Sequence, residues 1–143
     1  MILVSACLAG YRCRYDGGTC PDEGVMELVR QGKAIPACPE VLGGLPMPRP
    51  PAELTVDGAA VLTGKGRVMT KDGRDVTEEF LKGAHETLRI CRLYGVERAI
   101  LKANSPSCGS GMIYDGSFTG TKKPGDGVTA MLLRVNGIPV ENR

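Results

Sequence analysis

Histidine and tryptophan are nearly missing from this sequence, which has one histidine, His85, and no tryptophan. A metal centre built from several histidines is therefore excluded, and a Ser-His-Asp triad would have only one possible base. Long hydrophobic runs are also missing, because no uninterrupted apolar stretch exceeds four residues. Such short runs cannot form a membrane-spanning helix. Since the N-terminus carries no basic leader with a hydrophobic segment, we expect a cytoplasmic protein with no membrane partner.

A strong charge of either sign is absent as well. The 18 Lys and Arg residues and the 16 Asp and Glu residues leave a net charge of only +2. This excess is too small to favour a nucleic-acid polymer as partner. With 143 residues, 42% of them hydrophobic, the chain is long enough to bury one core. We therefore expect a single domain over residues 1–143, and no internal repeat is visible.

Short apolar runs alternate along the chain with helical patterns. The runs predict four strands, over residues 2–6, 33–37, 96–103 and 138–140. The helical patterns lie over residues 21–31, 75–94 and 128–136. Pro21 is expected at the first position of the first helix, and Asp75 with Glu78 has the spacing of a capping box.

Two further segments are expected outside this pattern: short strands or a small hairpin within residues 54–70, and a glycine-rich loop over residues 109–127. Strands that alternate with helices form parallel β-α-β units. The fold class predicted is α/β, a small three-layer domain with a mostly parallel, Rossmann-like sheet and a short β excursion.

Cysteine is plentiful, with six residues in a chain that shows no secretion signal. In such a chain, metal binding or catalysis is a commoner use of cysteine than a disulfide framework. Cys7, Cys38 and Cys108 each lie at or just past the end of a predicted strand, so we expect them to meet at one edge of the sheet. Three thiolates from three loops suit a soft metal or an iron–sulfur cluster.

Other uses of the cysteines stay open at this point. Structural zinc usually involves a C-x2-C pair, which the chain lacks, and a thiol–disulfide switch is a further alternative. Cys91 falls on the apolar stripe of the long helix, where a core role is expected. Cys13 and Cys20 lie in the loop before the first helix, and their roles are undecided. A cubane cluster held by three cysteines would leave one iron open to act as a Lewis acid.

Five sequence blocks span nearly the whole chain: SACLAGYRCRYDGG, CPEVLGGLPMPRPPAE, GRDVTEEFLKGA, ILKANSPSCGSGMIYDG and GDGVTAMLL. They resemble, in the same order, the signature motifs of the domain-of-unknown-function 523 family, one branch of which comprises thiouracil desulfidases. The resemblance implies a [4Fe-4S] cluster on Cys7, Cys38 and Cys108. It also implies Glu40 and Ser105 as the catalytic side chains, and the removal of sulfur from thiolated uracils.

The chemistry of these residues fits that role. Glu40 lies two residues from Cys38, close enough to activate water or to move a proton to a ring nitrogen, although a solvated loop carboxylate is the alternative. Ser105 precedes Cys108 by three residues and is a candidate for positioning the substrate or relaying a proton, although Ser-Pro-Ser is also an ordinary turn.

Five further residues are candidates for binding a small thiolated pyrimidine or nucleotide. Arg14, Tyr15 and Asp16 lie in one loop, where Tyr15 is suited to stacking on a flat ring. Arg49 and Lys102 are candidates for a phosphate group, if the substrate is a nucleotide. The competing interpretation is a non-catalytic or redox protein whose cysteines bind zinc or form a disulfide.

Overall fold

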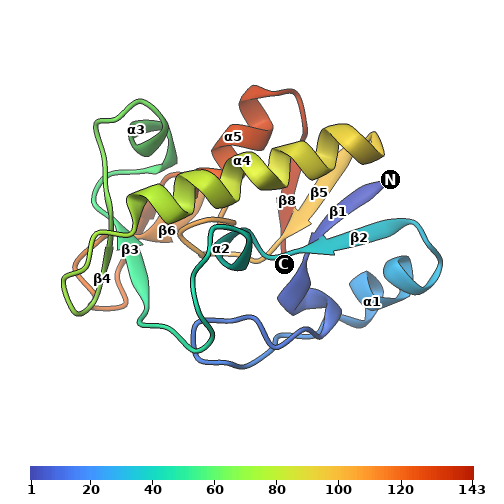
Figure 1. Ribbon diagram of the computed structural model, residues 1–143, viewed down its shortest axis with the longest axis horizontal. Coiled ribbons are helices and arrows are strands. Elements are labelled where there is room, and N and C mark those ends of the chain that lie inside the picture. The colour runs from blue at the N-terminus through green and yellow to red at the C-terminus, as the bar shows by residue number, and fades with distance from the viewer.

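A parallel four-stranded sheet is the middle layer of the computed structural model, which describes residues 1–143 (Figure 1). Its strand order is β2-β1-β5-β8, and every neighbouring pair is parallel. The bounds are β1 Ile2–Ser5, β2 Ala34–Ala37, β5 Arg98–Leu101 and β8 Val140–Asn142. The edge strand predicted over residues 138–140 thus begins two residues later than expected, at Val140. It follows Pro139, which has no N–H to give to a ladder.

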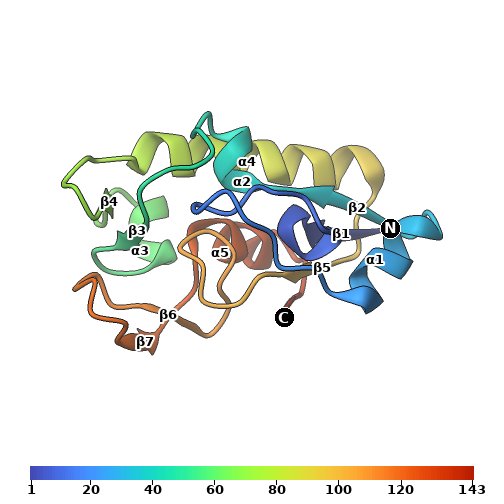
Figure 2. The same ribbon diagram turned by 90° about the horizontal axis from the view of Figure 1, so that it is seen from below.

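Helices cover both faces of this sheet, which confirms the predicted three-layer α/β fold (Figures 1 and 2). The long helix α4 (Thr77–Tyr94) and helix α5 (Val128–Val135) pack on one face, and α1 (Glu23–Arg30) packs on the other. Neighbouring residues of β1 face opposite layers: Leu3 joins the core beneath α4, whereas Val4 joins the core against α1. A strand buried on both faces is typical of a parallel sheet.

Two short helices appear where the sequence gave no helical signal. Helix α2 (Pro39–Leu42) begins directly after β2, with Cys38 as its N-cap and a proline at its first position. Helix α3 (Gly58–Leu62) has Asp57 as its N-cap, and the Asp57 carboxylate accepts a hydrogen bond from the Ala60 N–H at 2.9 Å. Helices this short show no repeating hydrophobic face, so periodicity could not reveal them.

Two antiparallel hairpins complete the chain. Strands β3 (Ala52–Leu54) and β4 (Val68–Thr70) pair with each other, and α3 lies between them in the sequence. This pair confirms the expected β excursion. Strands β6 (Met112–Tyr114) and β7 (Lys122–Pro124) pair within the glycine-rich segment, for which no strand was predicted. Only Ile113 of this second hairpin is fully buried, so the hydrophobic alternation that marks a strand is absent.

The helix starts show how local side chains set the boundaries. Asp22 caps α1 by accepting the Val25 N–H at 3.0 Å, so the expected start at Pro21 is wrong by two residues. Asp75 accepts hydrogen bonds from the N–H and hydroxyl of Thr77 at the start of α4, at 2.9 and 2.6 Å. These bonds lower the pKa of Asp75.

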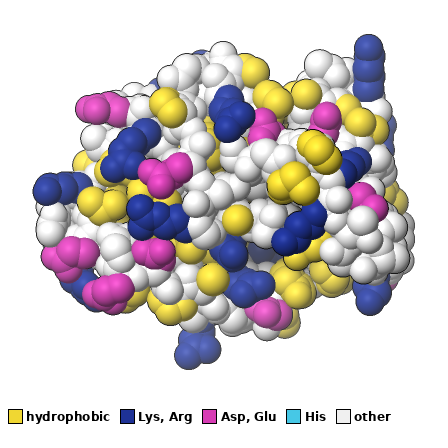
Figure 3. Space-filling model, turned by 180° about the vertical axis from the view of Figure 1, so that it is seen from behind, with side chains coloured by type: hydrophobic (Ala, Val, Ile, Leu, Met, Phe, Trp, Pro, Cys, Tyr) yellow, Lys and Arg dark blue, Asp and Glu magenta, His cyan; other side chains and the backbone are white.

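The outer surface is mixed in character. On the rear face in Figure 3, acidic and basic side chains are interspersed among apolar and neutral ones. His85 is exposed on α4. None of the helices combines the length and apolar character that a membrane crossing requires.

Candidate active site

A cavity of about 400 Å³ opens where the carboxyl ends of three strands meet. Cys7 lies on a single 3-10 turn, η1 (Ala6–Ala9), directly after β1, and Cys38 lies between β2 and α2. Cys108 lies in the turn that follows β5. All three cysteines line this one cavity, so the topology brings together thiols that are 31 and 70 residues apart in the sequence.

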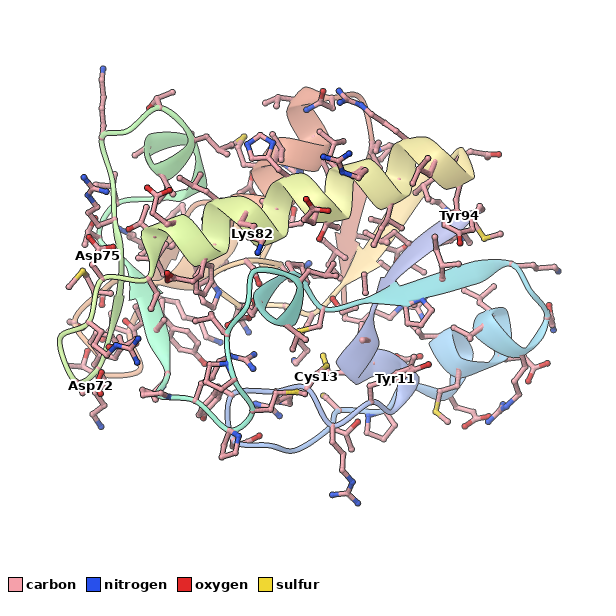
Figure 4. The ribbon with its side chains drawn as sticks, in the orientation of Figure 1. Tyr11, Cys13, Asp72, Asp75, Lys82 and Tyr94 are labelled. Atoms are coloured by element: carbon pink, nitrogen blue, oxygen red, sulfur yellow. The ribbon has the colours of Figure 1, made fainter.

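Cys13 is a fourth thiol of the same cavity, and sequence reasoning had left it undecided. The loop that carries it passes beneath α2, and its sulfur lies on the inner side of this loop (Figure 4). The thiol of Cys38 contacts the backbone carbonyl of Cys13, with 3.8 Å between sulfur and oxygen. Cys13 is only 6% exposed, and it is a free thiol like the chain's five other cysteines.

The cavity thiols differ in acidity because their surroundings differ. A hydrogen bond from Cys13 lowers the pKa of Cys7, and the same kind of bond lowers the pKa of Cys38 to about 7. The pKa of Cys13 itself is raised, because the neighbouring thiols of Cys38 and Cys7 favour its protonated form. Burial raises the pKa of Cys108 to about 12, although the Ser5 hydroxyl lies 3.5 Å from its sulfur.

Glu40 enters the cavity from the first turn of α2, where two buried partners hold its carboxylate. One oxygen lies 3.4 Å from the Arg49 guanidinium, and the other accepts the Ser107 hydroxyl at 3.1 Å. The Arg49 side chain is only 5% exposed and also donates to the backbone carbonyls of Cys13 and Pro46, at 3.0 and 3.3 Å. Arg49 therefore ties the Cys13 loop and α2 together.

Ser105 also lines the cavity, at the start of the Ser-Pro-Ser-Cys turn. Its hydroxyl oxygen accepts the backbone N–H groups of Ser107 and Cys108, at 3.1 and 3.0 Å. The same oxygen lies 3.1 Å from the Ser107 hydroxyl. Ser105 thus organises the backbone of the turn and also lines the cavity, while its expected role toward a substrate stays a prediction.

The five residues expected to bind substrate occupy different positions. Arg14, Tyr15 and Lys102 line the cavity, and the Arg14 guanidinium lies 5.9 Å from the centre of the Tyr15 ring. Asp16 is exposed outside the cavity lining, where it accepts the Gly18 N–H. Arg49 lines the cavity, and its guanidinium already contacts Glu40 and the carbonyls of Cys13 and Pro46. That Arg49 binds a phosphate group stays a prediction.

The outer part of the cavity has an aromatic wall that sequence reasoning missed. Tyr114 and Phe118 come from the second hairpin and its turn, and Lys71 comes from the end of β4. Glu53 fixes this turn by accepting the N–H groups of Gly116 and Phe118, at 2.9 and 3.2 Å. Phe118 has a φ of 57°, an unusual conformation for an aromatic residue, which these bonds stabilise.

The remaining two cysteines lie outside the cavity lining. Cys91 is 2% exposed on α4 in the main core, as expected, and burial raises its pKa to about 11. Cys20 is partly buried against the core that lies between the sheet and α1. No group of three or more His, Cys, Asp or Glu side chains is arranged to hold a single metal ion.

Fold and cavity together define a class: a small three-layer α/β protein whose thiol-lined strand-end cavity also holds a fixed carboxylate. The chain belongs to the 2-thiouracil desulfurase family, whose model matches residues 2–143. It is 49% identical over 141 residues to the uncharacterized protein YbbK of Bacillus subtilis (strain 168), a match that covers 98% of this chain and 93% of YbbK.

A solved structure agrees with this assignment. The fold is similar to that of the [4Fe-4S]-dependent thiouracil desulfidase TudS, with a TM-score of 0.87 and 46% sequence identity. The alignment covers 99% of this chain and 89% of the TudS chain. The family suggested by the sequence motifs is thereby confirmed.

Proposed function

We propose that this protein is a [4Fe-4S]-dependent desulfidase that removes sulfur from a small thiolated pyrimidine. In this proposal Cys7, Cys38 and Cys108 hold the cluster, and Glu40 is the acid–base group. The observation that best supports this proposal is that these three thiols and the Glu40 carboxylate line one cavity. The family, and the name of the similar structure TudS, support both the cofactor and the reaction class.

The residues present suit an iron–sulfur cluster. All the cysteines are free, and the three proposed ligands come from three separate strand ends. A cluster spreads its ligands over several irons, so its thiolates can stand farther apart than those around one ion. This spacing agrees with the absence of a single-ion site in the chain. The lowered pKa of Cys7 and Cys38 favours the thiolate form that iron requires, whereas Cys108, whose pKa burial raises to about 12, would have to lose its proton to iron itself.

When bound on three cysteines, a cluster supplies one open iron, which polarises a thiocarbonyl through its soft sulfur. Glu40, held by Arg49 and Ser107, is placed to take a proton from water, whose oxygen then adds to the ring carbon. The net reaction exchanges C=S for C=O, consuming water and releasing hydrogen sulfide.

The rest of the cavity fits a flat, polar substrate. Tyr15, Tyr114 and Phe118 offer aromatic surfaces to a pyrimidine ring. Arg14, Arg49 and Lys102 place positive charge at the same cavity, and they are the candidates for binding an anionic substituent if the substrate is a nucleotide. The proposed ligand is therefore a single thiolated base or nucleotide rather than a nucleic-acid polymer.

The test uses protein purified without oxygen. We expect a brown protein with bound iron and inorganic sulfide, which releases sulfide from 2-thiouracil or 4-thiouracil. Glu40→Gln keeps the shape of the side chain but removes the base, so activity should fall by about a hundredfold to ten-thousandfold at unchanged iron content.

Two outcomes would contradict this proposal. A colourless protein that binds zinc, or one with a Cys13 disulfide, would favour the non-catalytic or redox alternative. Full activity in Glu40→Gln would remove the carboxylate from the mechanism.

A further inference from the structure

The turn between β6 and β7 is tied to the rest of the protein by Glu53, a side chain that the proposed function does not use. One oxygen of the Glu53 carboxylate, on β3, accepts the backbone N–H groups of Gly116 and Phe118, at 2.9 and 3.2 Å. These partners are 63 and 65 residues away from Glu53 in the sequence. The bonds are therefore tertiary contacts that set where the turn lies, rather than local bonds of the turn itself.

The turn has a conformation that needs such support. Phe118 has a φ of 57°, in the left-handed region that large side chains rarely adopt. Gly116 has a φ of 93° and approaches β3 so closely that a Cβ would lie 2.9 Å from the Leu54 carbonyl oxygen. An unfavourable backbone conformation persists only where the surrounding structure holds it. The contacts with β3 therefore select one position for the Phe118 side chain.

That position is at the cavity, where Phe118 is one of three aromatic lining residues. The other two carry cations over their rings: the Arg14 guanidinium lies 5.9 Å from the centre of the Tyr15 ring, and the Lys122 amine lies 5.8 Å from that of Tyr114. No cation lies over the Phe118 ring, which is entirely apolar and stays partly exposed. Of the three rings, Phe118 therefore offers the least occupied face to a ligand.

We propose that the Phe118 ring stacks on the pyrimidine ring of the substrate, and that Glu53 is a positioning residue that holds Phe118 in place for this contact. This inference rests on the proposed desulfidase function and names the residue that binds the flat face of the base. Stacking depends on the π-face that every base has, so it supplies affinity without reading the ring substituents. Because the base stays flat-faced throughout the reaction, the contact should lower KM and leave kcat unchanged.

The main test compares iron-loaded variants of Phe118. Phe118→Leu should raise KM for 4-thiouracil by about fivefold to a hundredfold, the range for loss of a base–aromatic stack, with kcat and iron content unchanged. Phe118→Tyr keeps an aromatic ring and should retain most of the affinity. Leucine and tyrosine are both L residues with a Cβ and a large side chain, so each meets the same backbone restriction and the comparison isolates the ring.

Variants of Glu53 test the positioning role. Glu53→Ala should raise KM to a similar extent, whereas Glu53→Gln, whose amide oxygen can still accept both N–H groups, should restore most of the affinity. Thr119→Ala is the matched control and should leave KM unchanged, because Thr119 is an exposed residue of the same turn outside the cavity lining. Its hydroxyl bonds only Ser117 and Thr121, within the hairpin.

A double variant separates positioning from direct binding, since Glu53 itself also lines the cavity. If Glu53 acts only through Phe118, adding Glu53→Ala to Phe118→Leu should cost no further affinity. Losses that multiply would give Glu53 a substrate contact of its own and overturn the positioning role. Equal KM values in Glu53→Ala and Glu53→Gln, or a rise in Thr119→Ala as large as that in Glu53→Ala, would overturn it too. So would a loss of iron in Glu53→Ala, because a structural defect would then explain the effect.

The contact can also be followed without turnover. The chain has no tryptophan, so Phe118→Trp introduces a single indole at the proposed stacking position. In the loaded protein 4-thiouracil should quench its fluorescence beyond the quenching of free tryptophan titrated in parallel. Adding Glu53→Ala should raise the 4-thiouracil concentration needed for half of this effect by about fivefold or more.

The outcomes distinguish this inference from the proposed function. An indole that 4-thiouracil does not quench, or an unchanged KM in Phe118→Leu while sulfide is still released, would overturn the stacking contact and leave the desulfidase function standing. Specific quenching in a loaded protein that releases no sulfide from thiouracils would instead overturn the proposed function, while the contact between Phe118 and the base would remain.

Discussion

At the scale of single residues, the four cavity cysteines do not share one environment. Cys7, Cys13 and Cys38 interact through their thiols, whereas Cys108 is fully buried beside Ser5 and Ser107. A thiolate ligand must lose its proton to bind iron, which is easiest where a neighbouring donor lowers the pKa. Cys13 lowers the pKa of Cys7 and Cys38, so we expect it to support the proposed ligands without being one of them.

The proposed ligand set makes a prediction that serine substitutions can test. Cys7→Ser, Cys38→Ser and Cys108→Ser should each abolish cluster retention, because serine is a poor replacement for a thiolate at iron. Cys13→Ser should keep its iron, as should Cys91→Ser in the core. Iron and sulfide content, with the visible spectrum, provide the measurement.

Two results would change this assignment. Iron that survives the loss of Cys7, Cys38 or Cys108 would remove that residue from the set, and iron lost in Cys13→Ser would add Cys13 to it. Loss in Cys91→Ser, a control outside the cavity, would show that the readout reports folding rather than ligation.

At the scale of elements, the position of α2 decides where Cys38 and Glu40 lie. Two glycines let α2 approach α4 closely: a Cβ at Gly43 would lie 2.0 Å from the Glu79 carbonyl oxygen, and one at Gly83 would lie 1.9 Å from the Pro39 carbonyl oxygen. No side chain fits in either place. The site therefore depends on a helix contact that lies outside the cavity.

Gly83→Ala tests this dependence. Inside a helix, alanine normally stabilises by about 1 kcal/mol relative to glycine, so a destabilised variant would report the clash rather than helix propensity. We expect the free energy of unfolding to fall by roughly 1–3 kcal/mol, as for other overpacked sites. Cluster content should fall as well, because α2 must shift. Chemical denaturation and iron analysis give both values.

His85→Ala is the matched control on the same helix, since His85 is exposed. Its free energy of unfolding should change by less than about 0.5 kcal/mol. Equal stability in Gly83→Ala and the parent would show that the two helices can separate without cost, contrary to this interpretation.

At the scale of the whole molecule, a cluster would join loops that follow β1, β2 and β5, strands that are neighbours in the sheet. A group that binds only the folded chain stabilises it, and metal binding of this kind is coupled to folding. The cluster would thus act as a cross-link at one end of the sheet, where Cys108 also belongs to the core beneath α4.

Removal of the cluster, by a chelator with an oxidant followed by thiol reduction, should therefore lower the unfolding temperature. Each 1 kcal/mol lost corresponds to about 4 °C for a domain of this size. Hydrogen exchange should accelerate in the loops around Cys7, Cys38 and Cys108 and stay unchanged in the middle of α4. In Cys38→Ser the same treatment should change neither quantity. An unfolding temperature that is the same before and after removal would contradict a cluster bridging these loops.

The fold was largely predictable wherever one helix or strand carries its own signal. Apolar runs marked the four strands of the main sheet, and the repeating apolar face of α4, with Asp75 near its start, marked the longest helix. Helices α2 and α3 and the β6–β7 hairpin were missed. They are stabilised by caps, by a close glycine contact and by packing on other elements, none of which leaves a periodic pattern in the sequence.

The sequence by itself determined the family, the thiols that follow three strand ends, and the candidates Glu40 and Ser105, because each of these depends on motifs or on local order. Only the tertiary structure placed Cys13 among the cavity thiols, tied Arg49 to Glu40, and put Ser107 between Glu40 and Ser105. The physical reason is distance along the chain. Glu40 and Ser107 are 67 residues apart, and a hydrogen bond between them exists only after β1 has brought β2 and β5 to its two sides.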